Sequence, residues 1–296
     1  MQFYKYGIIV ALVVLLSGVP ARAQVFSSGN CLTAPSQDDL SGFQPLPDGE
    51  IFCPLLADPK AKRSFASMID GTAEDFPSRI GAVGIGDGFG LFRWGIVQLS
   101  LSGSVFSQFD LGSPSYDLIN ADYIIGIPLT VRYRGFSGRL RAYHQSSHLG
   151  DEYLLRDQVE RENLSFESVE LILSQEIGPL RLYGGGEHLI SPSPDDLASM
   201  VAHGGVELLP GFSILRVGNL GSARLIAAGD VKVIEEQDWE TGVSLRAGFE
   251  VSRAEAPASP ISRWQLMFEY YDGPTPYGQF FRRDLSYWGV GIHFTR

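Results

Sequence analysis

The sequence predicts an all-β fold: a transmembrane antiparallel up-and-down β-barrel of about 12 strands with a cleaved signal peptide. Apolar and polar residues alternate with a period of two through most of the chain. The alternating segments are long, for example 14 residues each in 121–134 and 239–252, and aromatic residues lie near both ends. Soluble strands cluster near five or six residues, whereas a tilted strand that crosses a bilayer needs about 9–11.

Residues 1–23 have the features of a secretory signal peptide. Lys5 precedes a continuous apolar stretch from Gly7 to Val19, and Ala21-Arg22-Ala23 forms a small-residue cleavage site. An uncleaved anchor helix is the alternative, and the cleavage site argues against it. Residues 24–61 contain five prolines and no alternation, so we expect a periplasmic N-terminal segment or a plug. The remaining residues, 62–296, are expected to form the barrel.

Charge and cysteine content exclude two classes of function. Without Lys5 and Arg22, the mature chain has 21 basic and 34 acidic residues, a net charge of −13. Such a chain lacks the basic surface that nucleic-acid binding requires. Cys31 and Cys53 are the only cysteines. They could close a disulfide or remain two thiols, and they are too few for a zinc site.

The strands are assigned from the alternation. Between Tyr123 and Tyr133, apolar side chains occupy the odd positions and mostly polar or small residues lie between them. At about 3.3 Å per residue and a 45° tilt, these tyrosines lie roughly 23 Å apart along the membrane normal. A soluble β-sandwich would explain the alternation but not this length. The predicted strands span residues 62–70, 80–91, 94–109, 121–134, 136–148, 163–177, 180–190, 199–209, 222–235, 239–252, 262–271 and 285–295.

An even number of strands places both ends of a bacterial barrel in the periplasm. The tight turns at 134–135 and 178–179 then face the periplasm. The longer connections face outward, namely 149–162, 191–198 and 272–284. Two connections fit less well: 210–221 is long for a periplasmic turn, and 236–238 is short for an external loop. Ten or fourteen strands therefore remain alternatives.

Charged residues on the polar faces are expected to pair inside the lumen. The inward-facing basic residues are Arg132, Arg139, Arg141, Arg224, Arg246 and Arg263, and the inward-facing acids are Glu170, Glu187, Glu250 and Glu269. A small anion-selective pore is the alternative interpretation. A barrel of about twelve strands is narrow enough for side chains or the N-terminal segment to fill it, so we expect a salt-bridged plug.

Several stretches resemble an uncharacterised family of bacterial outer-membrane proteins, domain of unknown function 1207. They occur in order over roughly residues 46–294: Pro54–Lys60 (PLLADPK), Arg141–Tyr153 (RAYHQSSHLGDEY), Arg161–Glu167 (RENLSFE), Leu182–Glu187 (LYGGGE) and Tyr277–Phe280 (YGQF). The resemblance implies an outer-membrane barrel with no known activity, inserted by the barrel assembly machinery. Such barrels usually end on an aromatic residue, and here Thr295-Arg296 follows Phe294.

Polar residues on one lipid-facing strand suggest chemistry. Parity places His144 and Ser146 on the face of Leu140 and Ala142. A base beside a serine hydroxyl can activate it as a nucleophile. Parity also puts Asn163, Ser165 and Glu167 on the lipid face of the next strand, where Asn or Glu could orient the imidazole.

This arrangement resembles outer-membrane phospholipase A over residues 143–167, and lipid A deacylases use a similar His-x-Ser with a Glu. The resemblance implies Ser146 as nucleophile, His144 as base and Asn163 as orienting residue. The calcium site of that family has no clear counterpart, although Asp151 or Glu152 could bind the cation.

Two functions follow as hypotheses. One is a non-enzymatic outer-membrane barrel, structural or a narrow channel. The other is a Ser–His lipid acyl hydrolase whose partner is outer-membrane lipid. Polar side chains at the outer rim of a strand commonly just meet headgroups and water, so the deciding feature is whether His144, Ser146 and an orienting residue converge on the lipid face.

Overall fold

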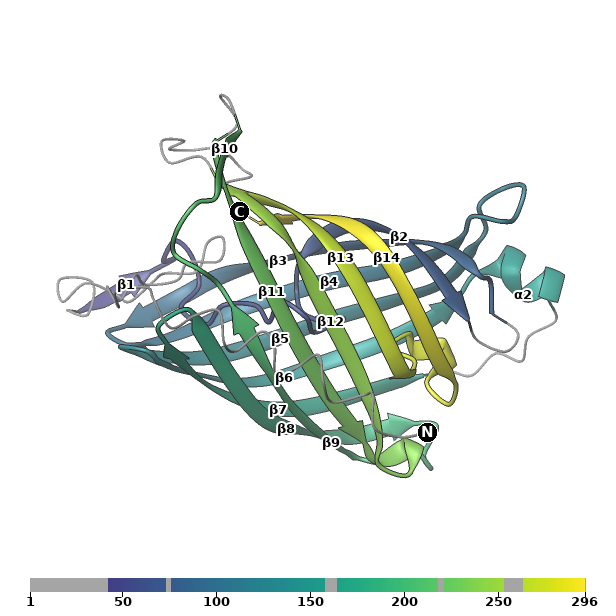
Figure 1. Ribbon diagram of the computed structural model, residues 1–296. Helices are drawn as coiled ribbons and strands as arrows, with labels where there is room; N and C mark the ends of the chain where they lie inside the picture. Colours follow the sequence, from purple (N-terminus) through teal and green to yellow (C-terminus); the bar gives the residue numbers. More distant parts are fainter. Residues whose placement is uncertain (1–41, 73–75, 158–163, 218–220, 253–262, 296) are drawn as a thin grey trace, which may run out of the picture.

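The computed structural model describes residues 42–72, 76–157, 164–217, 221–252 and 263–295 (Figure 1). Twelve antiparallel strands form one closed ring, because β2 pairs with both β3 and β14 while β3 pairs onward with β4. The strands are β2 Ser64–Thr72, β3 Arg79–Trp94, β4 Val97–Asp110, β5 Leu118–Tyr133, β6 Phe136–Leu149, β7 Ser165–Ile177, β8 Leu180–Ser193, β9 Met200–Leu208, β11 Gly221–Ile234, β12 Glu240–Ser252, β13 Arg263–Pro274 and β14 Asp284–Thr295. The predicted barrel and its strand number are confirmed.

Short strands, a helix and 3-10 turns lie at the two ends of the ring. β1 (Phe43–Pro45) pairs with the end of β3, and β10 (Leu215–Val217) pairs with the start of β11 in the long 210–221 connection. At the opposite end lie α2 (Asp151–Asp157) and the 3-10 turns η3 (Glu235–Gln237) and η4 (Gly278–Phe280). Within the described residues, no helix has the length and apolar character needed to cross a membrane. The predicted signal peptide and Cys31 lie outside the described residues, and Cys53 is disulfide-bonded.

The outer surface of the ring is apolar. Side chains on this face are exposed although they are large and hydrophobic, among them Ile125, Ile127, Leu129, Leu171, Leu173, Leu245, Phe249, Leu266, Phe268, Val290 and Ile292. Aromatic residues border this band, with Trp94, Tyr133 and Phe136 at the end that carries β1 and Tyr123, Tyr270 and Trp288 at the other. An apolar band with aromatic girdles is typical of outer-membrane barrels.

The lumen holds the polar half of each strand, and its charges are paired. Arg139 and Arg141 contact the two carboxylate oxygens of Glu170 at 2.8 and 2.9 Å. The other pairs are Arg224–Glu250, Arg263–Glu250, Arg246–Glu269 and Arg132–Glu176. Five of the six predicted lumenal arginines therefore pair with the predicted glutamates. Arg132 pairs instead with Glu176, and Glu187 accepts hydrogen bonds from Tyr143 and Ser168.

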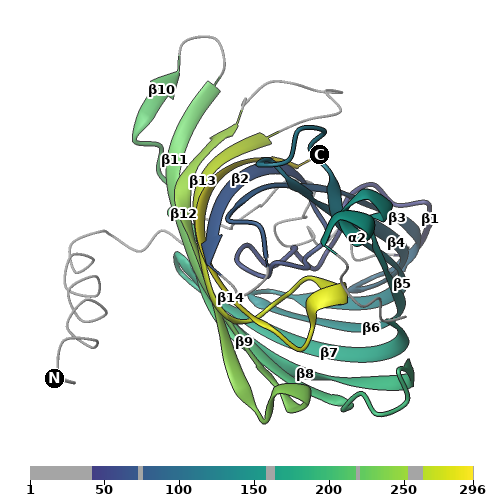
Figure 2. The same cartoon turned by 90° about the vertical axis from the view of Figure 1, so that its right-hand side faces the viewer.

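A segment of the chain before β2 runs through the interior. Residues 51–61, the plug segment, are mostly buried, and Figure 2 shows this part of the chain inside the ring of strands. The guanidinium groups of Arg139 on β6 and Arg181 on β8 each lie over its Phe52 ring, 4.8 Å from the ring centroid. Cation–π contacts of desolvated arginines of this kind contribute about 1–2 kcal/mol each, so the wall holds this end of the segment.

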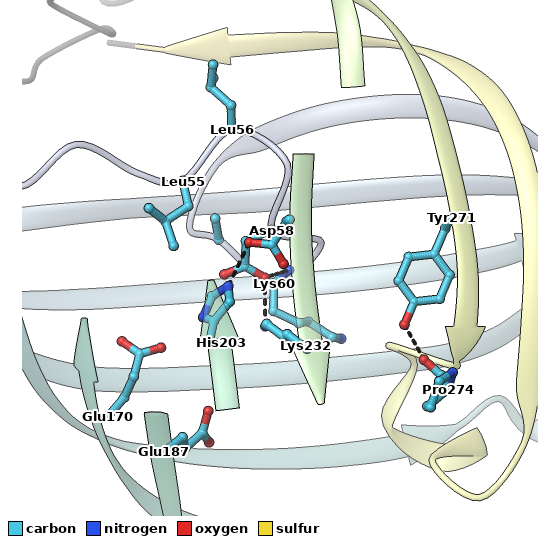
Figure 3. Close-up of polar contacts among 12 residues, drawn as sticks. Leu55, Leu56, Asp58, Lys60, Glu170, Glu187, His203, Lys232, Tyr271 and Pro274 are labelled. Atoms are coloured by element: carbon cyan, nitrogen blue, oxygen red, sulfur yellow. Dashed lines mark hydrogen bonds and ion pairs between the residues drawn. The ribbon is translucent and has the colours of Figure 1, made fainter. Parts of the chain in front are cut away.

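The backbone and charges of the plug segment contact further strands. The Leu56 N–H donates to Glu207 on β9 at 2.7 Å, and Arg246 on β12 donates to the Leu56 carbonyl at 2.9 Å. Lys60 pairs with Asp122 on β5. Asp58 pairs with Lys232 on β11 (Figure 3). The plug segment thus contacts six strands of the wall, namely β5, β6, β8, β9, β11 and β12.

The connection after β13 folds back into the barrel mouth instead of extending away from it. The Gly278 N–H donates to Asp122 and the Gln279 N–H donates to Asn120. A Cβ at position 278 would come 1.8 Å from the Ser147 hydroxyl oxygen, so only glycine permits this approach. Phe280 joins a buried cluster with Tyr153 of α2 and Tyr277, and the cluster closes this side of the mouth.

Candidate active site on the outer wall

His144 and Ser146 lie on the outer face of β6, as parity predicts. Their neighbours Tyr143, Gln145 and Ser147 are buried in the lumen, while His144 and Ser146 are half-buried among outer-face residues. Ser146 is level with Tyr123 on β5, directly across the strand pair. Tyr123 belongs to the aromatic girdle at the α2 end, so the hydroxyl of Ser146 sits where headgroups and acyl chains meet.

The imidazole of His144 is held by a carboxylate from the next strand. The β6–β7 register places His144 directly opposite Glu167, and the Nδ1 atom lies 3.1 Å from Glu167 Oε1. The pair is open to its surroundings, with side chains 41% and 54% exposed. An acceptor at Nδ1 favours the tautomer that carries its proton there. The other nitrogen, Nε2, is then left as a proton acceptor.

Ser146 is two residues from His144 on the same face. Side chains at i and i+2 stand about 6.6 Å apart along a strand and can lean together. The described residues show no hydrogen bond between them. Nucleophile and base are often farther apart before substrate binds than during the reaction. Opposite Ser146 lies Ser165 on β7, which offers a second hydroxyl at the same level.

The remaining site residues predicted from the sequence are Asn163, Asp151 and Glu152. Asn163 lies outside the described residues. Asp151 and Glu152 are exposed in the first turn of α2, and the described structure gathers no third acidic or histidine ligand around them. The side chain that contacts His144 is Glu167, which strand parity places on the same face. The calcium assignment to Asp151 and Glu152 remains a prediction.

One group in the lumen has the donor types of a metal site. Asp58 of the plug segment, His203 of β9 and Asp230 of β11 have ligand atoms within 4.8 Å of one another. Their atoms are already used, since His203 Nε2 lies 2.7 Å from Asp230 and the Tyr183 hydroxyl donates to the same oxygen. The Lys232 ammonium lies 2.8 Å from Asp58 and supplies the positive charge that a metal would bring (Figure 3).

Sequence reasoning did not identify this group. In the sequence, Asp230 and Lys232 are polar residues of one alternating segment, and His203 is an isolated histidine. Asp58 lies in a Pro-rich segment without periodicity, so its position in the lumen could not be read from the pattern. The available signal was that positions 230 and 232 are two residues apart on one strand, so their side chains lie on the same face.

Asp58 makes the stability of the plug sensitive to acid. Burial raises the pKa of this carboxyl, but Lys232, His203 and the Lys60 N–H together lower the pKa well below its ordinary value. A lowered folded-state pKa contributes stability above the unfolded-state value of about 4, and this contribution is lost as the pH falls. When the pH is lowered from 5 to 3, the free energy of unfolding of Asp58→Asn should therefore decrease less than that of the wild type.

The measurement is urea unfolding in detergent micelles, followed by tryptophan fluorescence at several pH values. Asp151→Asn is the matched control because Asp151 is exposed at the tip of the barrel, and its pH profile should follow the wild type. Parallel profiles for wild type and Asp58→Asn would contradict the assigned contribution.

Comparison with solved structures supports the fold. The structure is similar to outer membrane phospholipase A from Escherichia coli, with 13% identity, a TM-score of 0.56 and coverage of 83% of this chain and 94% of that one. It is also similar to the Salmonella typhi outer membrane phospholipase dimer with bound calcium, with 13% identity, a TM-score of 0.54 and coverage of 80% and 93%. At this identity the likeness concerns the fold alone.

No curated protein matches the sequence. The profile of one family, described as protein of unknown function (DUF1207), matches residues 21–295, which is nearly the whole chain. Together with the closed twelve-strand ring and its apolar outer face, this match identifies the chain as an outer-membrane β-barrel protein that belongs to the DUF1207 family.

Proposed function

We propose that the protein resides in a bacterial outer membrane and hydrolyses acyl esters of lipids in the outer leaflet, with Ser146 as nucleophile, His144 as base and Glu167 as orienting carboxylate. The observation that carries this proposal is the contact between His144 Nδ1 and Glu167 Oε1 beside Ser146. In a serine triad the carboxylate binds this side of the imidazole, so that the other nitrogen can take the serine proton.

The position of these residues supports a lipid substrate. They face the membrane and lie at the level of the aromatic girdle, where the ester bonds of an outer-leaflet lipid are within reach. In the proposed reaction, Ser146 Oγ attacks the ester carbonyl while His144 Nε2 takes the hydroxyl proton. His144 returns this proton to the leaving alcohol, and a water activated by His144 then cleaves the acyl-serine ester.

A closed structural barrel is the second candidate, and the plug segment favours it. Among the described residues, buried ion pairs and the Phe52 contacts occupy part of the lumen, which argues against an open solute channel. This candidate requires no reactive group on the outer wall, so an activity assay separates the two.

The decisive assay measures fatty acid release from phospholipid in mixed micelles by the refolded full chain. Calcium and EDTA form the two arms, because the resemblance in sequence assigns a calcium to Asp151 or Glu152 in the first turn of α2. In at least one arm, we expect fatty acid to be released faster than from the same phospholipid micelles without protein. Absence of release in both arms, from protein whose folded state is verified by its heat-dependent gel mobility, would leave the structural barrel.

Glu167→Gln is expected to lower kcat by about 10²-fold with little change in KM, because the amide keeps the size of the side chain but not the charge that stabilises the imidazolium. Asn163→Ala is the comparison variant, since the sequence resemblance assigned the orienting role to Asn163. A larger loss in Asn163→Ala than in Glu167→Gln would transfer that role to Asn163. Equal kcat values for the wild type, Glu167→Gln and Asn163→Ala would show that neither Glu167 nor Asn163 orients His144.

A further inference from the structure

A cavity of about 160 Å³ lies inside the barrel, on the far side of the wall from Ser146. Its floor is formed by Pro59 and Lys60 of the plug segment. Its upper rim comes from the connections at the α2 end, at 197–198, 236 and 274–281. Because these connections are the ones predicted to face outward, the cavity opens toward the outside and ends blindly on the plug segment.

The walls of the cavity are largely apolar. The apolar part of the wall comes from Ile124, Phe166, Leu189, Leu197, Val201 and Phe281, and polar side chains such as Tyr143, Gln145 and Ser244 complete it. Cavities of this volume that are lined by Leu, Ile and Phe bind molecules the size of benzene. The cavity is therefore large enough for one compact ring or a short branched chain.

The charged groups at the base of the cavity already have partners. Lys60 pairs with Asp122, Lys232 with Asp58, and Arg141 with Glu170. On the acidic side, Asp230 contacts His203 and Tyr183, and Glu187 accepts from Tyr143 and Ser168. An ionic ligand would have to displace one of these partners or remain unpaired in a desolvated site, and both are unfavourable.

An uncharged ligand avoids that cost and still finds a donor. Lys232 borders the cavity, and among the described residues its ammonium donates one hydrogen bond, to Asp58 Oδ1. An ammonium has three N–H groups, so a neutral oxygen acceptor can be bound without breaking the ion pair.

We propose that this cavity binds a compact, uncharged, mainly apolar molecule with one hydrogen-bond-accepting oxygen, for which an aromatic ketone is the simplest representative. The oxygen accepts from Lys232 and the ring packs against Phe166 and Leu189. The site is inside the lumen, whereas the proposed hydrolase site is on the outer wall, so the two proposals stand or fall separately.

The test compares three probes of nearly equal size: acetophenone (neutral), benzoate (anion) and benzylamine (cation). Binding to the refolded full chain in micelles is measured by ligand-observed NMR, with empty micelles subtracted. Acetophenone should bind at least ten-fold more tightly than either ion. Tighter binding of benzoate or benzylamine, or no binding of acetophenone, would overturn the proposal.

Variants place the bound probe. Ser244→Phe, on a buried side chain that lines the cavity, and Ala198→Met, in a connection at its rim, should each weaken acetophenone binding at least five-fold by filling the space. One wall position and one rim position are used, so that if one variant fails to fold, the other still tests the site. Ser107→Phe is the control, because Ser107 faces outward opposite Val83. Equal weakening in the control, or none in the two filling variants, would contradict the lumenal site.

The hydrogen bond is tested with the paired variant Lys232→Met with Asp58→Asn, which removes donor and counter-charge together. Acetophenone should bind several-fold more weakly to it, whereas toluene, which has no oxygen, should bind equally to both proteins. Equal loss for toluene and acetophenone would show that Lys232 shapes the cavity and does not donate to the ligand.

Discussion

Ser146→Ala is expected to lower kcat for acyl-ester hydrolysis by about 10⁴-fold or more. Without the hydroxyl there is no nucleophile for the acyl transfer, and the His144–Glu167 pair that remains has no proton to take. Binding of the lipid should change little, because the variant removes one oxygen from an apolar outer wall. The measurement is fatty acid release at saturating phospholipid.

Ser165→Ala is the matched control for this prediction. Ser165 lies directly opposite Ser146 on the neighbouring strand and has the same hydroxyl at the same membrane level. Its activity should remain within a few-fold of the wild type. If Ser146→Ala retains wild-type activity, Ser146 is not the nucleophile, and if only Ser165→Ala loses activity, the nucleophile is on β7.

The barrel was predictable because its pattern is local. Each strand can be recognised from apolar and polar residues that alternate with a period of two, because a lipid-facing wall requires every second residue to be apolar. The faces of His144, Ser146 and Glu167 followed from the same parity. Pairing of inward arginines with inward glutamates was also predicted, and it holds for five of the six predicted arginines.

What could not be predicted depends on register and on contacts distant in the sequence. Glu167 lies opposite His144 because of the β6–β7 register. The long connection between these strands leaves that register unspecified, so Asn163 and Glu167 were equally placed. The plug segment has no periodicity, and its contacts join Asp58 to Lys232 and Leu56 to Glu207. The inward fold of η4 depends on Gly278 packing against Ser147, which no hydropathy pattern encodes.

Glu269→Met is expected to lower the free energy of unfolding by about 3–5 kcal/mol, because it leaves a buried arginine without its counter-charge. Glu269 lies 3.0 Å from Arg246 and 3.0 Å from His293 Nε2, and accepts from the Ser67 hydroxyl at 2.6 Å. All four side chains are buried. Urea unfolding and refolding in micelles, followed by tryptophan fluorescence, measures the loss.

Two comparison variants show which part of that loss is electrostatic. The double variant Glu269→Met with Arg246→Met removes both charges, and most of the stability should return, since a buried ion pair and an apolar pair of similar volume are often equivalent. About 1 kcal/mol should stay lost, because Arg246 also donates to the Leu56 carbonyl of the plug segment. Glu167→Met breaks an exposed pair on the outer wall and should cost less than about 1 kcal/mol.

The comparison decides why the lumen is charged at all. If the double variant is as unstable as Glu269→Met alone, the ion pairs themselves hold the barrel together. If the double variant regains most of the stability, the ion pairs contribute little net stability. Their role is then to position the plug segment, which Arg246 contacts at Leu56. The second outcome is expected, because desolvation of both charges offsets most of their attraction. The lumenal charges would then serve mainly to hold residues 51–61 in one place inside the ring.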